Sequence, residues 1–164
     1  RAKMPSPKVI LNAFLPVTVK ELNSYVYEQK RRYKIMKIVV LAGGTSTERE
    51  ISIVSGTGIC GALRQKGHEA ILVDIFCGVE NVDWENPFPA EYDVEKAAEY
   101  MSSFNPQIKE MEKKRRSFFG PNVLELCEKC DIVFLGLHGA NGEDGKVQAA
   151  FDLMGIRYTG TGYG

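Results

Sequence analysis

One stretch near the end of the chain limits its possible folds most strongly, because an apolar run over 131–137 leads into a glycine-rich turn and a helical pattern. The run is short and rich in β-branched and aromatic residues, as in strands that are covered on both faces of a parallel sheet. Beyond the turn, the spacing predicts one helix over 143–154, with Asn141 as its N-cap and Gly155 as its stop. The stretch therefore predicts a strand–turn–helix unit of an α/β sheet.

His138 lies directly after this predicted strand. In open α/β sheets, ligands bind beyond the carboxyl ends of the strands, where loops shape a crevice and the sheet holds them rigid. We therefore treat His138 as a candidate site residue. The structural alternative is a histidine that is hydrogen-bonded within its own turn.

A second strand–turn–helix unit runs over 36–66. Its turn, which begins at Gly43, lacks the three spaced glycines of a dinucleotide site and the Gly-Lys-Ser/Thr of a phosphate loop. Instead, Glu48 and Glu50 place two carboxylates at the positive end of the helix, where they repel an anion. A ligand ammonium would be attracted there.

Both glutamates also fit a purely structural role. Thr45 with Glu48, or Thr47 with Glu50, has the three-residue spacing of a capping box. Only one of the two registers can form the cap, so the other carboxylate stays available to a ligand. Along the helix we expect an inward face of Ile51, Val54, Gly58, Ile59, Ala62 and Leu63, with Gly56, Gly58 and Gly61 allowing close approach to the sheet.

Two further apolar runs, over 70–75 and 156–159, predict additional short strands. Asp74 resembles the ribose-binding acidic residue of dinucleotide folds, but it lies roughly thirty residues after the glycine turn, where about 20 are expected. We therefore discount a ribose site. Between 77 and 121 the chain becomes polar and is punctuated by prolines, which predicts an insertion with short helices.

The charge balance excludes several classes of protein. Lys+Arg and Asp+Glu number 21 each, so no overall field attracts nucleic acid or an anionic membrane. The basic runs at 30–34 and 113–116 lie in helical patterns and predict solvated surfaces. No apolar stretch approaches the roughly 20 residues of a membrane span, and no signal peptide opens the chain. We expect a cytoplasmic protein without nucleic-acid or membrane partners.

Cys127 and Cys130 have the spacing of a redox motif or of half a zinc site. No second pair of Cys or His lies at matching spacing, and the flanking residues are apolar. We expect packed thiols and no metal.

Residues 1–35 differ in character from the remainder. They predict a strand over 8–14 and then an amphipathic helix that opens with a capping box from Thr18 to Glu21. We expect this segment to be an extension of unknown role, natural or artificial.

Two stretches together resemble a known family. Residues 41–52 read Leu-Ala-Gly-Gly-Thr-Ser-Thr-Glu-Arg-Glu-Ile-Ser, and residues 137–162 contain His-Gly-Ala-Asn-Gly-Glu-Asp-Gly and Gly-Ile-Arg-Tyr-Thr-Gly-Thr-Gly. As an ordered pair, these motifs resemble the amino-terminal domain of D-alanine–D-alanine ligases of the ATP-grasp superfamily. The resemblance covers 36–164 and implies a Rossmann-like, open, mainly parallel α/β sheet with helices on both faces.

The resemblance implies an enzyme that uses ATP and Mg²⁺ (or Mn²⁺) to phosphorylate the carboxylate of a first D-alanine. The amine of a second D-alanine then attacks the acyl phosphate, which gives the dipeptide for peptidoglycan. Motif by motif, Glu48 corresponds to the residue at the ammonium of the first D-alanine, His138 to a residue near its carboxylate, and Glu143 to a supporting residue at the site.

The family's ATP-binding and metal-binding positions lie in domains that follow this one, and no position of this sequence corresponds to them. We therefore expect residues 36–164 to be a substrate-binding domain that is inactive alone. A homodimer is the default expectation from the family.

Other functions stay open from the sequence. A ligase of the same family that joins D-alanine to D-lactate or D-serine fits equally, because the second substrate site lies outside these residues. A non-catalytic α/β module that binds an amino acid or a partner chain is the alternative from another class. A dinucleotide-dependent oxidoreductase comes third, because the glycine pattern disfavours it.

Overall fold

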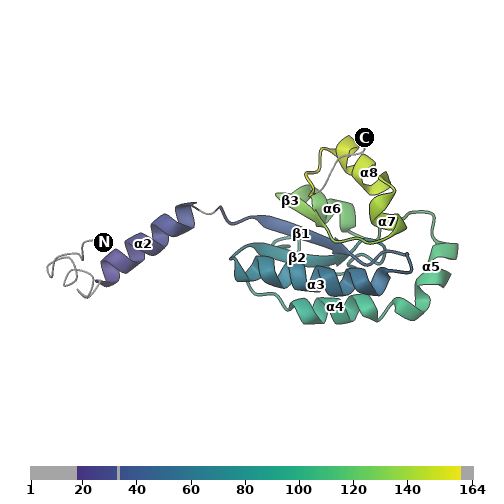
Figure 1. The fold of residues 1–164 in the computed structure, drawn as a ribbon, viewed down its shortest axis with the longest axis horizontal. Coiled ribbons are helices and arrows are strands. Elements are labelled where there is room, and N and C mark those ends of the chain that lie inside the picture. The colour runs from purple at the N-terminus through teal and green to yellow at the C-terminus, as the bar shows by residue number, and fades with distance from the viewer. Residues whose placement is uncertain (1–17, 33, 160–164) are drawn as a thin grey trace, which may run out of the picture. The chain divides into compact units, whose positions relative to one another are not determined.

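The structure, a computed structural model, describes residues 18–32 and 34–159 (Figure 1). The chain divides into two compact units, residues 1–34 and 35–164. In the second unit the elements follow in the order β1 (Lys37–Ala42), α3 (Arg49–Gln65), β2 (Glu69–Asp74), α4 (Val94–Ser102), the 3-10 helix η1 (Asn105–Gln107), α5 (Ile108–Lys114), α6 (Val123–Lys129), β3 (Ile132–Leu135), α7 (Ala140–Glu143) and α8 (Lys146–Met154).

The described part of the first unit is the helix α2 (Val19–Arg32). Its start is a reciprocal capping box, in which the Thr18 amide and hydroxyl each donate to the Glu21 carboxylate at 2.8 Å and the Glu21 amide donates to Thr18 Oγ1 at 3.2 Å. The cap expected from the sequence is thus confirmed. The strand predicted over 8–14 lies outside the described residues.

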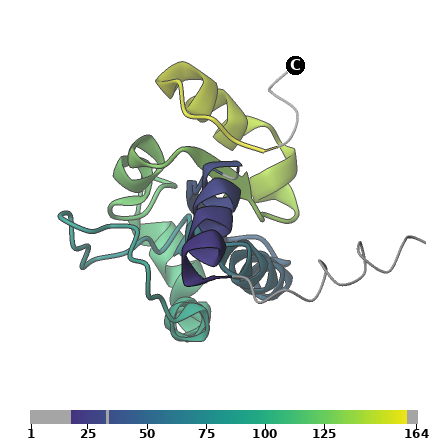
Figure 2. The ribbon, with the colours of Figure 1, turned by 90° about the vertical axis from the view of Figure 1, so that its left-hand side faces the viewer.

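The three strands form a parallel sheet in the order β2–β1–β3. Lys37 pairs with Glu69 at the start of β2, and Ile38 pairs with Ile132 at the start of β3. Helices cover both faces of the sheet, with α3 and α4 on one side and α6 and α8 on the other (Figures 1 and 2). The predicted open parallel α/β architecture is confirmed.

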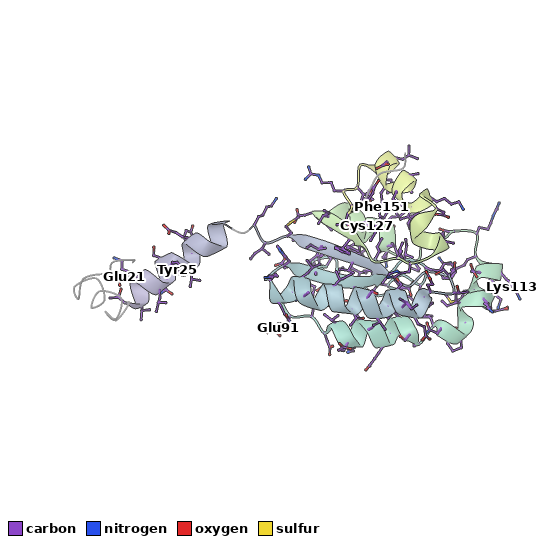
Figure 3. The ribbon with its side chains drawn as sticks, viewed as in Figure 1. Glu21, Tyr25, Glu91, Lys113, Cys127 and Phe151 are labelled. Carbon is purple, nitrogen blue, oxygen red and sulfur yellow. The ribbon has the colours of Figure 1, made fainter. Side chains whose placement is uncertain are left out.

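The alternation of side chains along β1 divides the core into two layers. Even-numbered residues such as Val40 face α3 and α4, where they pack with Ile53, Cys60 and Met101. Odd-numbered residues such as Val39 face α6 and α8. The side chains of Cys127 and Phe151 lie in this second layer (Figure 3).

The inward face of α3 differs from the predicted one. Ile51 and Val54 are 57% and 73% exposed, and the buried positions are Arg49, Ser52, Ile53, Gly56 and Cys60. Ile59 and Leu63 do pack partly against the core, as predicted. Apolar periodicity alone failed because small and polar residues hold the positions at which α3 meets the sheet.

Of the three glycines on α3, only Gly56 lies against the sheet. A Cβ at Gly56 would come within 2.7 Å of the Ala42 Cβ, whereas one at Gly58 or Gly61 would have no neighbour within 4 Å. The prediction of close approach is therefore right for the first glycine and wrong for the other two.

The single helix predicted over 143–154 is divided into α7 and α8. Gly145 adopts a φ of +75°, a left-handed conformation that interrupts the helix. The N-cap residue of α7 is Gly139 rather than the predicted Asn141. The predicted stop is confirmed, because Gly155 ends α8 with a φ of +68°.

The strand predicted over 156–159 is reduced to an isolated parallel bridge between Val133 and Tyr158. The Val133 amide donates to Arg157 O at 2.8 Å, and the Thr159 amide donates to Val133 O at 2.9 Å. The segment therefore follows the free edge of β3 without forming a full strand among the described residues.

Side chains cover the opposite edge of the sheet. The Tyr92 hydroxyl accepts from the Leu72 amide at 3.1 Å and donates to the Leu72 carbonyl oxygen at 3.2 Å. Arg64 Nη1 donates to Ala70 O at 2.6 Å. The outward-facing backbone of β2 is thereby hydrogen-bonded without another strand. No helix in the described part of the chain is long and apolar enough to cross a membrane.

Candidate functional site

The loops that follow β1 and β3 meet at the carboxyl edge of the sheet. The chain passes from β1 through α3 to β2 on one side, while β3 pairs with the other side of β1. The connections therefore diverge between β1 and β3, and at such switch points open α/β sheets form their ligand crevices. The turns of both strand–turn–helix units predicted from the sequence lie at this edge.

Ser52 ties these two loops together. Its buried hydroxyl accepts from the Gly43 amide at 3.0 Å and donates to Gly136 O at 2.7 Å. A single hydroxyl thus sets the spacing of the turn after β1 and the turn after β3. The sequence analysis missed this residue, for which the only signal was a serine among apolar helix residues.

The structure brings Glu48 and His138 to the same crevice. Ser46 Oγ donates to His138 O at 3.0 Å and accepts from the Glu48 amide at 3.2 Å. Glu48 Oε2 lies 2.9 Å from the position that a Cβ would take at Gly139, the residue after the histidine. Glycine is required there both for space and for its φ of +67°.

The carboxylate of Glu48 is exposed, and the imidazole of His138 is half-buried with Nε2 at 3.3 Å from Ser55 Oγ. The edge of the sheet therefore offers one accessible anion beside one imidazole. This pair can accept an ammonium group and bind a second polar group of the same small molecule.

Glu50 points to another part of the molecule. Its Oε1 accepts from Asn105 Nδ2 at 2.9 Å, on the side of η1. Neither predicted capping box forms the start of α3, because the N-cap position belongs to Glu48 itself, without a side-chain cap bond. Between the two glutamates, only Glu48 is placed beside the loop that carries His138.

The side chain of Glu143 lies outside the described part of the structure. Its backbone ends α7, the short helix that follows His138 and Gly139. Its supporting role at the site stays a prediction.

A buried ion pair, which the sequence analysis missed, holds the turn that carries Glu48. Arg49 Nη2 lies 2.6 Å from Asp74 Oδ2, and both side chains are almost fully buried. The contact of Oδ2 with Arg49 is an ion pair whose geometry is not that of a hydrogen bond. Arg49 Nη1 also donates to Gly44 O at 2.8 Å, and Nη2 donates to Met101 O at 2.8 Å.

The other oxygen of Asp74 is also occupied. Oδ1 accepts from the amides of Phe76 at 2.9 Å and Cys77 at 3.0 Å, just beyond β2. A carboxylate that is buried and paired in this way is not available to a ribose, which agrees with our rejection of a dinucleotide site.

The described residues contain no group of three or more His, Cys, Asp or Glu that could hold a metal ion. Cys127 is buried and Cys130 half-buried at the end of α6. Burial raises the pKa of the Cys130 thiol to about 11, so the reactive thiolate is scarce at neutral pH. These features support the packing role expected for the pair.

A cavity of about 680 Å³ lies elsewhere, between α4 and the residues after β2. Tyr92, Tyr100 and Met101 contribute to its walls, whereas Glu48 and His138 do not. The paired carboxylate and imidazole lie instead at the switch point of the sheet.

Known proteins resemble this chain over its second unit. A family model described as D-ala D-ala ligase N-terminus matches residues 37–161. The D-alanine–D-alanine ligase of Lacticaseibacillus casei is 46% identical over 137 residues, which cover 77% of this chain and 37% of that protein. The enzyme of the same name from Pediococcus pentosaceus is 43% identical over 132 residues, which cover 77% of this chain and 38% of that one.

Among solved structures, the D-alanine–D-alanine ligase from Coxiella burnetii matches with a TM-score of 0.45 and 26% identity, over 77% of this chain and 36% of that one. The chain thus spans little more than a third of the length of the curated relatives it matches.

Proposed function

Because this chain belongs to the family of D-alanine–D-alanine ligase N-termini, we propose that it is the part of an ATP-dependent ligase that binds the first of two D-alanine molecules. The ligase would form the dipeptide that enters peptidoglycan. The observation that carries the proposal is the placement of the Glu48 carboxylate and the His138 imidazole at one switch point of the sheet.

In this proposal, Glu48 binds the ammonium of the amino acid. A charge-assisted hydrogen bond between ammonium and carboxylate is roughly twice as strong as a neutral one, and the exposed Glu48 side chain is accessible to such a ligand. His138 faces the carboxylate of the same molecule and stabilises the negative charge on it. Glu143 supports the site from α7.

The described residues do not fit ATP or Mg²⁺. Glu48 and Glu50 stand at the start of α3, where they repel phosphate groups, and no described group of three metal-ligating side chains exists. We therefore assign the sites for ATP and Mg²⁺ (or Mn²⁺) to other domains of the longer ligase. Residues 36–164 alone would then not catalyse ligation.

The remaining parts of the proposal concern organisation. We assign residues 36–164 to the substrate-binding domain and residues 1–35 to an extension of unknown role, a division supported by the boundary between the two compact units. A cytoplasmic homodimer is the state we propose for the ligase. Size-exclusion chromatography with light scattering would measure the oligomeric state.

The first test is ADP release from ATP and Mg²⁺ by the protein expressed from the gene read beyond Gly164. We expect release that depends on D-alanine and does not occur with L-alanine. Assays in which D-lactate or D-serine is supplied together with D-alanine distinguish this ligase from family members that join D-alanine to D-lactate or D-serine. Absence of release with every D-substrate would overturn the ligase proposal in favour of a non-catalytic amino-acid-binding module.

A matched pair of variants tests the site itself. Glu48→Gln removes the charge beside the His138 loop, and we expect the KM for the first D-alanine to rise roughly 10–100-fold, the usual effect of losing a hydrogen bond to a charged group. Glu50→Gln removes a carboxylate from the same turn of α3, but from its η1 side, and should leave KM within about twofold. Equal effects of the two substitutions would remove Glu48 from the site.

A further inference from the structure

Three polar residues lie at the i, i+4, i+7 spacing of a helical stripe, the N-cap residue Glu48 and, within α3, Ser52 and Ser55. All three contact the loop over 136–139. Ser52 donates to the first residue of the loop at 2.7 Å, Ser55 Oγ lies 3.3 Å from His138 Nε2, and Glu48 lies beside the last residue. The proposed function uses Glu48 and His138 and leaves Ser55 without a role.

The hydrogen bonds of Ser55 fix the direction of its contact with the histidine. Ser55 Oγ donates its only proton to Ile51 O at 2.8 Å, one turn earlier in α3. The same oxygen can therefore only accept from His138 Nε2. It follows that Nε2 carries a proton and that, in the neutral ring, Nδ1 holds the lone pair.

We propose that Ser55 is a positioning residue that holds His138 as the Nε2–H tautomer and presents Nδ1 to the ligand. No described residue is hydrogen-bonded to Nδ1. The D-alanine carboxylate of the proposed function binds at Nδ1 once that atom has also taken up a proton, and Ser55 Oγ still accepts from Nε2–H in this doubly protonated ring. The identity of the ligand rests on the proposed function; the tautomer does not.

Thr57 provides a matched control on the same helix. Its hydroxyl donates to Ile53 O at 2.7 Å, which is the same bond to the preceding turn that Ser55 makes. Among the described residues, no histidine is hydrogen-bonded to Thr57. Comparing Ser55→Ala with Thr57→Ala therefore separates the contact to His138 from the intrahelical bond.

The test is ¹⁵N NMR of the histidine rings in the labelled 164-residue chain, at about pH 8.5, where ordinary histidines are neutral. The chain has two histidines, His68 and His138. The Met36 amide donates to His68 Nδ1 at 3.2 Å, which makes His68 an internal Nε2–H reference. We expect His138 to show a single Nε2–H form with a slowly exchanging ring proton.

In Ser55→Ala, we expect the Nδ1–H form of His138 to gain population and its ring proton to exchange faster. Ser55→Thr, which keeps the hydroxyl, should restore the original spectrum, and Thr57→Ala should leave it unchanged. A wild-type His138 in the Nδ1–H form, or a spectrum that Ser55→Ala does not alter, would overturn the proposal.

The longer ligase supplies the functional measurement. Ser55→Ala should lower kcat/KM for the first D-alanine roughly tenfold, the effect of about one hydrogen bond, and Ser55→Thr should recover it. An altered tautomer with unchanged kcat/KM would refute the link to the ligand. A wild-type enzyme without D-alanine-dependent ADP release would refute the proposed function, while the NMR result would still decide the role of Ser55.

Discussion

Replacing Gly56 by alanine should destabilise the fold, although alanine is the better helix former. A Cβ at Gly56 would lie 2.7 Å from the Ala42 Cβ and 3.1 Å from Leu72 Cδ1. The leucine side chain can turn aside, but the Ala42 Cβ is fixed to the buried central strand. To accept the extra methyl group, α3 would have to move away from the sheet.

The magnitude follows from two opposing contributions. Overpacking of a core costs about 1–3 kcal/mol, and a contact this short belongs at the upper end. Alanine returns about 1 kcal/mol through its helix propensity, which leaves a net loss of about 2 kcal/mol. Gly58 and Gly61 have open space at the Cβ position, so alanine at either site should stabilise the protein by about 0.5–1 kcal/mol.

The assay is urea unfolding of the wild-type chain and the three single variants, followed by circular dichroism and tryptophan fluorescence. We expect Gly56→Ala to unfold at a lower urea concentration than the wild type and the other two variants at a higher one. For a domain of this size, 1 kcal/mol shifts Tm by about 2–4 °C. A Gly56→Ala protein as stable as Gly58→Ala would refute the close contact between α3 and β1.

Three further predictions concern buried polar groups. Tyr92→Phe leaves the outward-facing amide and carbonyl of Leu72 unpaired and should cost about 1–3 kcal/mol in urea unfolding; an unchanged midpoint would contradict the edge contact. Arg49→Met leaves the Asp74 carboxylate buried without its ion-pair partner and should lower the free energy of unfolding by about 3–5 kcal/mol. Adding Asp74→Asn should recover part of that loss. A double variant less stable than the single one would refute the ion pair. Burial raises the pKa of Cys60 to about 11 from 9.0, so the folded state binds the proton more tightly, and stability should fall as pH rises from about 9 to about 11. In Cys60→Ala, the free energy of unfolding should fall less steeply between those pH values. An equal slope of unfolding free energy against pH in both proteins would argue against a raised pKa of Cys60.

Two of the strands were predictable from sequence nearly to the residue. Apolar runs over 36–42 and 70–75 correspond to β1 and β2, because continuous β-branched stretches occur where both faces of a parallel strand are covered. The rotation of α3 was not predictable in the same way. Ser52 and Gly56 face the sheet since one links two loops and the other permits close packing, and neither requirement appears in a hydrophobic pattern.

The site shows the same division. His138 and Glu48 could be chosen as candidates from the sequence because each follows a predicted strand, and parallel strands bring their carboxyl ends to one edge. Ser55 was missed because its partner is 83 residues away in the chain. The ion pair of Arg49 with Asp74 was missed because charged residues are taken as exposed unless a partner is known.

The hydrogen-bonded edge of β2 limits the side on which further strands can join this sheet. At the β2 edge, Tyr92 and Arg64 already occupy the backbone groups with which an incoming strand would pair. On the opposite side, Tyr158 begins a parallel ladder along Val133. Any strand added to this sheet, from the same polypeptide or from another, would therefore extend it beyond β3, and the β2 side would form its permanent boundary.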